Sequence, residues 1–213
     1  MRKHARLGFA VLAFAALIPA LRAQQGFFRP PEIQGVWNPV VGSGGSYESR
    51  SASGEKSVVD AFVVGKESLG GKDAYWIEIV KHGTGDSSPA FMLKSLATFD
   101  AGVLQISKSF VQIGTSAPLE LPIQESSETS LSVDIRGKGQ KAGSETITTP
   151  AGKFVCEHWR SEDGGDYWIS SNVSPYGLVK SANKDGGGLT LIRRIRNAKD
   201  KMTAAPKSSK QAG

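Results

Sequence analysis

Cysteine is nearly absent from this sequence: Cys156 is the only one among 213 residues, which include only three histidines. A single cysteine cannot close an internal disulfide, so the fold must be held together by its core. Beyond the first 23 residues only His82 and His158 remain, and with one thiol they supply no set of zinc ligands at the usual spacing. We therefore expect no disulfide scaffold, no metal site and no cofactor.

Motifs for a serine nucleophile and for a phosphate-binding loop are also missing. A Gly-x-Ser-x-Gly elbow fails at Ser43, because Val41 stands where the first glycine is required. The glycine-rich segment 65–72 is one residue too long for a phosphate-binding loop and lies between two strand-like segments. These departures exclude the two commonest signatures of hydrolases and nucleotide-binding domains.

One pair of residues is compatible with an enzymatic function. Cys156 and His158 are two positions apart, which would place both side chains on one face of a strand. A nucleophilic pair needs an exposed thiolate, however, whereas Cys156 follows Phe154 and Val155 in a segment typical of a packed core. A hydrolase that uses His158 or an aspartate pair is the least favoured function, and we expect no enzyme.

Long hydrophobic runs are absent except at the start of the chain. Basic residues precede an apolar stretch over residues 7–18, which is shorter than the ~20 residues needed to cross a bilayer. This pattern predicts a signal peptide, residues 1–23, with cleavage after Ala23 and Ala20 as the alternative site. No cysteine follows either site to accept a lipid. We expect a mature protein that is periplasmic or secreted and is not an integral membrane protein.

The basic charge of the whole chain belongs mostly to its ends. Without residues 1–23 the chain has 22 Lys and Arg against 20 Asp and Glu, and residues 24–196 have 18 against 19. The composition of residues 197–213, rich in Lys, Ala and Ser, predicts a disordered basic tail. Because a nucleic-acid-binding domain needs a dense basic face, we expect no nucleic-acid partner.

The sequence does contain many strand-like segments, separated by turns of Gly, Ser, Pro, Asn and Asp. Segments 57–64 and 74–80 flank a Gly-Gly turn, which predicts a hairpin. Segments 145–149 and 153–160 flank a Pro-Ala-Gly turn, which predicts another. The segment 89–99 is the best candidate for a helix. The pattern favours a mainly β fold.

Both faces of the predicted strands are apolar. In segments 57–64 and 74–80, apolar residues occupy odd and even positions alike. An antiparallel sheet normally leaves one face to water, so two apolar faces require a second layer. That layer is either the protein's own side chains or a ligand on the concave side of a curved sheet, and the residues leave both alternatives open.

Several segments together carry a family resemblance. They are Val41-Gly-Ser-Gly44 with Tyr47-Glu48, Val64-Gly-Lys-Glu67, Tyr75-Trp-Ile-Glu78, Gly143-Ser-Glu-Thr-Ile-Thr-Thr-Pro-Ala-Gly-Lys-Phe-Val-Cys156, Trp168-Ile-Ser170 and Pro175-Tyr-Gly-Leu-Val-Lys180. Over these segments the chain resembles uncharacterised bacterial envelope proteins allied to the lipoprotein-carrier (LolA/LolB-like) superfamily. The resemblance implies a single LolA-like domain over residues 24–196. Its fold would be a strongly curved antiparallel sheet, a half-barrel of about ten strands, covered by one or two helices or loops. In characterised members the apolar concavity holds acyl chains.

A short sequence pattern occurs twice in the chain and points to candidate ligand-binding residues. The segments 70–78 and 164–170 share a Gly-Gly turn, an aspartate and then Tyr-Trp-Ile. This places Trp76 and Trp168 on equivalent faces of the sheet. With Phe91 and Met92 from the predicted covering segment, they are our candidates for residues that line an apolar cavity.

These observations favour a non-enzymatic periplasmic or secreted protein that binds an apolar or lipid-like ligand, such as an acyl chain, in the concavity of a curved sheet. The alternative is an envelope structural or interaction module with a self-filled core, no small ligand and an envelope protein as partner. An open apolar cavity would support the first, and a closed core with an exposed edge or patch would support the second.

Overall fold

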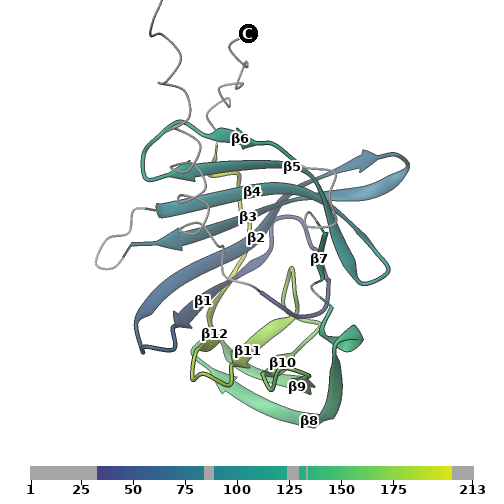
Figure 1. Cartoon of the computed structure of the whole chain (residues 1–213), viewed down its shortest axis with the longest axis vertical. Helices are drawn as coiled ribbons and strands as arrows, with labels where there is room; N and C mark the ends of the chain where they lie inside the picture. Colours follow the sequence, from purple (N-terminus) through teal and green to yellow (C-terminus); the bar gives the residue numbers. More distant parts are fainter. Residues whose placement is uncertain (1–32, 84–88, 124–129, 133, 203–213) are drawn as a thin grey trace, which may run out of the picture. The chain divides into compact units, whose positions relative to one another are not determined.

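The computed structural model describes residues 33–83, 89–123, 130–132 and 134–202 (Figure 1). The chain divides into two units, Met1–Glu32 and Ile33–Gly213, and every described residue belongs to the second. The predicted signal peptide and its cleavage site lie outside the described residues, as do residues 203–213 of the predicted tail. Within the described ranges, no helix has the length and hydrophobicity needed to span a membrane.

In the described residues, strands make up almost all of the regular structure. In chain order the elements are β1 (Gly44–Arg50), β2 (Lys56–Leu69), β3 (Lys72–His82), β4 (Pro89–Asp100), β5 (Val103–Ile113), β6 (Leu119–Leu121), β7 (Ser130–Ser132), the 3-10 helix η2 (Ile135–Gly137), β8 (Gly139–Thr149), β9 (Gly152–Ser161), β10 (Asp166–Ile169), β11 (Leu178–Ala182) and β12 (Gly188–Ile195).

The strands form one 12-stranded antiparallel sheet. Its order is β6-β5-β4-β3-β2-β1-β12-β11-β10-β9-β8, with β7 paired to β5 beside this path. Each half of the sheet is therefore a meander of consecutive strands, and the pairing of β1 with β12 joins the two halves (Figure 1). This confirms the predicted mainly β fold with a single curved, open antiparallel sheet.

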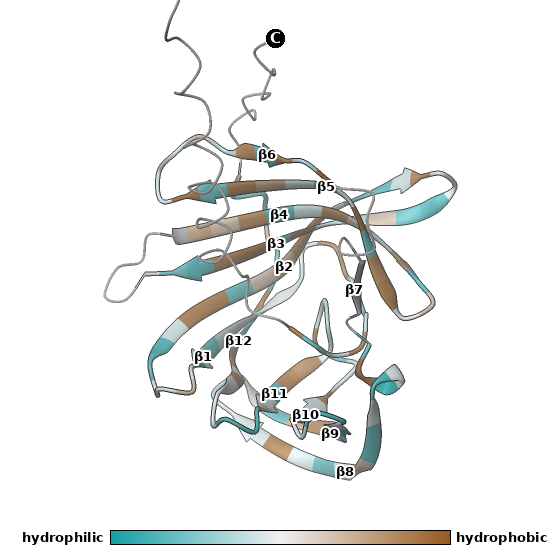
Figure 2. Cartoon of the chain, viewed as in Figure 1, coloured by the Kyte–Doolittle hydropathy of each residue, from teal (hydrophilic) through white to brown (hydrophobic). Residues whose placement is uncertain are grey.

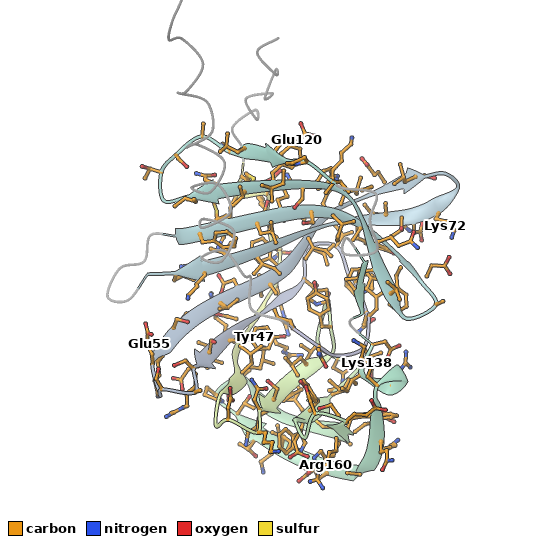
Figure 3. The ribbon with its side chains drawn as sticks, in the orientation of Figure 1. Tyr47, Glu55, Lys72, Glu120, Lys138 and Arg160 are labelled. Atoms are coloured by element: carbon orange, nitrogen blue, oxygen red, sulfur yellow. The ribbon has the colours of Figure 1, made fainter. Side chains whose placement is uncertain are left out.

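Both predicted hairpins are present, with longer strands than the sequence pattern indicated. β2 and β3 are joined by Gly70 and Gly71, whose φ angles of 58° and 79° lie in the left-handed region that a tight two-residue turn requires. β8 and β9 pair up to Thr149 and Gly152, so the chain reverses at the predicted Pro-Ala-Gly turn, with its glycine already in β9. Figure 3 shows Glu55, between β1 and β2, and Lys72, at the start of β3, at such chain reversals.

The helix predicted over residues 89–99 is wrong, because this segment forms β4 between β3 and β5. Met92 and Leu96 occupy one face of this strand, and Ala97 occupies the other. All three are buried, because both faces of the sheet are covered here. Apolar residues on both faces blur the period of two by which a strand is identified from sequence.

One face of the sheet, which we call the inner face, carries the main core. Its buried residues come from distant strands: Ala61, Ile77, Ala97 and Leu104 from β2–β5, Tyr167 and Ile169 from β10, and Leu189 and Leu191 from β12. The sheet must curve for these strands to share one core. Ile33 and Tyr176 from loops and Ile135 from η2 also pack there, so in the described residues loops and a short 3-10 helix complete the cover.

The opposite face, which we call the outer face, carries a second cluster on β2–β4. Phe62, Val80 and Met92 pack there with Met202, and each is at most 6% exposed. Figure 2 shows hydrophobic residues along the middle of these strands and hydrophilic ones near the β2–β3 turn.

Met202 belongs to residues 197–202, which follow β12 and which we call the strap. The packed chain therefore extends six residues beyond position 196, although composition predicts a disordered tail from residue 197 onward. Composition predicted disorder because residues 197–213 contain few apolar side chains. Two of these few, Ala198 and Met202, meet an apolar face that other strands provide.

Candidate functional site

A pocket of about 470 Å³ opens on the inner face, where β9 and the end of β10 meet residues 36–38. We call it the inner-face pocket. Val155 and Glu157 of β9 and Ile169 of β10 line it from the sheet, and Val36 and Trp37 line it from the opposite side. Its volume falls within the ~300–1,000 Å³ typical of small-molecule sites.

Backbone hydrogen bonds hold the wall that faces the sheet. The amide of Val36 donates to the carbonyl of Tyr176 and that of Asn38 to the carbonyl of Pro175, both at 2.7 Å. A third contact, from the amide of Ile135 to the carbonyl of Gly35 at 2.9 Å, ties the same segment to η2. Three chain segments far apart in sequence therefore fix this wall.

Trp37 is held by an aromatic cluster. Its ring lies 5.9 Å from Phe99, 5.9 Å from Tyr75 and 5.8 Å from Tyr176, measured between ring centroids. The ring of Trp37 is stacked on Phe99, edge-on to Tyr75 and tilted against Tyr176, and aromatic pairs at such separations favour stacked and edge-on arrangements. Trp37 is therefore a rigid part of the pocket wall.

Val155 provides apolar surface that the protein does not cover. It is 77% exposed, the most exposed of the large hydrophobic residues in the described part of the chain. Its neighbours Phe154 and Cys156 alternate with it along β9 and are buried in the main core. A ligand that covered Val155 would remove this apolar area from water, which is favourable.

Charged side chains at the pocket are already paired. Arg136 binds Asp134 through two nearly parallel hydrogen bonds of 2.9 and 2.7 Å, and these hold the pKa of the Asp134 carboxyl below its usual range. Glu157 is paired with Lys141, which lowers the pKa of Glu157, and also accepts a hydrogen bond from the indole of Trp159. The pocket therefore offers apolar surface and hydrogen-bonding groups but no single uncompensated charge.

The residues that could have formed a nucleophilic pair are used differently. Burial and the nearby charge of Glu145 raise the pKa of the Cys156 thiol to about 11, so it stays protonated at neutral pH. His158 places one ring nitrogen 2.8 Å from Asp166 and the other 3.2 Å from Glu145. Both ring nitrogens of His158 therefore face carboxylates.

The four predicted ligand-binding residues are not brought together, and none of them lines the inner-face pocket. Trp76 and Met92 lie on the outer face of β3 and β4, and Phe91, one position from Met92, lies on the opposite face of β4. Trp168 lies on β10, in the other half of the sheet.

Trp76 and Trp168, the tryptophans of the repeated sequence pattern, nevertheless have similar surroundings. Trp76 stacks on Phe110 with Lys94 5.2 Å from its ring centroid, and Trp168 stacks on His158 with Lys180 4.9 Å away. Directly opposed residues of paired strands share a face, and by this rule the strand register places both tryptophans on the outer face.

Sequence reasoning missed the residues of the inner-face pocket. The sequence around Val155 is typical of a packed strand, and no motif marks Trp37 as a functional residue. Arg136 belongs to a short 3-10 helix that shows no periodicity. No local pattern connects these residues, because they meet only in the folded chain.

Comparisons with known proteins do not identify a family. No protein-family profile and no curated protein matches the sequence significantly. A structure described as a candidate lipoprotein from Parabacteroides distasonis matches with a TM-score of 0.40 and 14% identity, covering 76% of this chain and 99% of that one. A candidate exported protein with a YmcC-like fold from Bacteroides fragilis matches with a TM-score of 0.39 and 10% identity, covering 76% and 100%. Because both scores lie below 0.5, neither match bears on ligand or activity.

Proposed function

We propose that this protein is an exported, non-enzymatic binding protein that holds an apolar or lipid-like ligand in the inner-face pocket. One observation supports the proposal: the inner-face pocket is lined by Val155, an aliphatic side chain that is 77% exposed, and by the ring of Trp37. Apolar walls with a few polar groups at the margin are the usual construction of small-molecule sites.

The polar margin suggests how such a ligand would be oriented. Arg136 is exposed beyond its pair with Asp134, and Ser170 and Ser171 also line the pocket. These groups can hydrogen-bond a polar head while the aliphatic part of the ligand covers Val155. The proposal therefore favours an amphipathic ligand, such as a fatty acid or phospholipid, over a pure hydrocarbon.

Native mass spectrometry of the protein purified from an envelope fraction tests this function. We expect a ligand mass that disappears under denaturing conditions. Val155→Asp should abolish it, because the substitution places a carboxylate against the aliphatic part of the ligand. Val41→Asp is the matched control, since Val41 is also exposed and does not line the pocket. An empty protein that takes up no fluorescent fatty acid, or an adduct retained by Val155→Asp, would disprove the proposal.

A second candidate function is an envelope interaction module, and the apolar edge of the sheet favours it. β6 is the last strand of the order, and Leu119 and Leu121 on it are 54% and 38% exposed, next to Ile113 at 46%. Exposed apolar residues on an edge strand are typical of surfaces that pair with another chain. If this is the function, chemical cross-linking in intact cells should trap a partner that Leu119→Asp releases and Val155→Asp retains.

A further inference from the structure

The strap is held on the outer face by polar contacts as well as by Met202. The amide of Lys201 donates to Glu78 Oε2 at 3.1 Å, and the Lys201 ammonium lies 3.4 Å from Asp60 Oδ2. Asp200 forms an ion pair with Lys94 of β4. These contacts join the strap to β2, β3 and β4 at once, so its position depends on the charges of that face.

Two carboxylates are buried beneath the strap. Glu78 is 1% exposed and Asp60 is 3% exposed. In the described part of the chain, Glu78 Oε1 and Asp60 Oδ1 have no hydrogen-bond partner. Burying a charged oxygen without a hydrogen-bond partner costs free energy, so the closed position of the strap is destabilised whenever both carboxylates are ionised.

Asp60 is well compensated. Burial raises the pKa of its carboxyl, but hydrogen bonds from Ser46 and His82 and the charge of Lys201 outweigh burial and lower it overall. His82 Nε2 lies 3.1 Å from Asp60 Oδ2, on the same oxygen that faces Lys201. Asp60 therefore remains ionised under the strap.

Glu78 is poorly compensated. The ammonium of Lys94 lies 4.0 Å from Glu78 Oε1, but the same ammonium pairs more closely with Asp200. Burial, followed by the contact with Asp200, raises the pKa of Glu78 from its ordinary value of 4.5 to about 7, although the Lys201 amide and Lys94 oppose this. Burial also raises the pKa of Asp200, but its contacts with Glu78 and Lys94 lower it overall, so the proton is held by Glu78.

We propose that the strap closes over the outer face when Glu78 is protonated and loosens when Glu78 ionises. A protonated Glu78 donates a hydrogen bond to Asp200, and Lys94 then has a single carboxylate to neutralise. An ionised Glu78 adds a second buried negative charge beside Asp200. Loosening exposes Phe62, Val80 and Met92, so mild alkalinity uncovers an apolar surface that mild acidity hides.

The direction of the pH effect follows from linkage. With the strap closed Glu78 binds its proton more tightly than with the strap open, where water reaches the carboxyl. Closure is therefore fully favoured below pH 4.5 and is lost as the pH rises through about 7. Between pH 6 and pH 8 the closing equilibrium should fall about tenfold. This inference is independent of the inner-face pocket.

Hydrogen–deuterium exchange of the full chain after export tests the strap directly. Labelling times are scaled to the intrinsic exchange rate at each pH, and a peptide that contains residues 197–202 is followed. Its protection should fall about tenfold between pH 6 and pH 8, while protection of peptides from β9–β12 stays constant. Equal protection of the strap at both pH values would overturn the proposal.

Variants separate Glu78 from other groups. Glu78→Gln keeps an acceptor for the Lys201 amide without the charge, so protection should become independent of pH. Asp200→Asn removes the carboxylate that raises the Glu78 pKa, so the loss of protection should move to lower pH. Glu67→Gln, at an exposed glutamate of β2, should retain the wild-type profile. If Glu78→Gln does not fold, the pH dependence of strap protection in the wild type and in Asp200→Asn still tests the proposal. A pH dependence that is the same in Asp200→Asn as in the wild type contradicts the mechanism.

Discussion

The phenolic hydroxyl of Tyr47 donates a hydrogen bond to the backbone carbonyl of Leu178 at 3.1 Å, and both residues are fully buried. Tyr47 lies on β1 and Leu178 on β11, and β12 separates these strands in the sheet. A contact across an intervening strand requires the tight curvature of the sheet at this point. Figure 3 marks Tyr47 where β1 approaches the second half of the sheet. Burial raises the pKa of Tyr47 far above its usual range, so the hydroxyl always has a proton to donate.

Removing this hydroxyl should therefore destabilise the fold. Tyr47→Phe leaves the Leu178 carbonyl buried without this donor, and we expect a loss of about 1–3 kcal/mol in the free energy of unfolding. Urea titration followed by tryptophan fluorescence measures it. Tyr75→Phe, at a half-buried tyrosine of β3, is the control and should change stability by less than about 0.5 kcal/mol. Similar small effects for both variants would mean that the Tyr47 hydrogen bond contributes nothing.

A glycine pair tests the wall of the inner-face pocket. A Cβ added at Gly35 would lie 1.9 Å from the carbonyl oxygen of Tyr176, so Gly35→Ala must displace residues 36–38. We expect it to lower thermal stability by more than about 1 kcal/mol and to weaken ligand uptake. At Gly137 an added Cβ meets no atom within 4 Å, so Gly137→Ala should behave as the wild type. Equal behaviour of the two variants would show that the wall is not rigid.

Global stability should also depend on pH through Glu78. Because its pKa is raised in the folded state, the native protein binds more protons than the unfolded chain between pH 4.5 and about 7, and stability falls as the pH rises through this window. The full loss is on the order of 3 kcal/mol. Guanidinium unfolding at pH 5, 6, 7 and 8 measures it, and Glu78→Gln should abolish most of the slope. Asp60 acts in the opposite direction and below this window, since its lowered pKa makes its contribution disappear only as the pH falls below about 4.

Cys156 should be unreactive in the folded protein. It is 1% exposed and its pKa is raised to about 11, so both access and thiolate formation are suppressed. We expect Ellman's reagent at pH 8 to label it only as fast as the protein unfolds, with a rate that rises steeply with added urea. Complete labelling within minutes in native buffer would mean that β9 opens locally and that its core position is not tightly packed.

Local features of the fold were predictable from neighbouring residues. Gly70 and Gly71 both adopt positive φ, and a Gly-Gly pair between apolar segments is sufficient to predict that turn. The presence of a covering layer on both faces was also predictable, because Phe62 and Ala61, adjacent in β2, cannot both face water without cost. What covers each face could not be predicted in the same way.

The candidate sites depended on contacts between distant segments. Val155 is a β-branched residue in a strand-like run, and nothing beside it indicates that it alone would be exposed in a pocket. Glu78 alternates with Trp76 and Val80, which predicts a strand but not a buried carboxylate, because the strap that buries it lies more than 100 residues later. The sequence predicts Trp76 and Met92 as ligand-binding residues. In the structure they lie on the outer face, on which the strap also packs.

The sequence by itself determined the strands, their turns and the need to cover two apolar faces, because alternation, β-branched residues and glycine conformations act over a few neighbouring residues. The tertiary structure alone decided that residues 89–99 form a strand, that residues 197–202 lie on the outer face, and that Lys94 is shared between Glu78 and Asp200. These outcomes depend on which distant segments become neighbours. That choice is made by the packing of the whole sheet, and burial then sets the cost of every charge that the packing encloses.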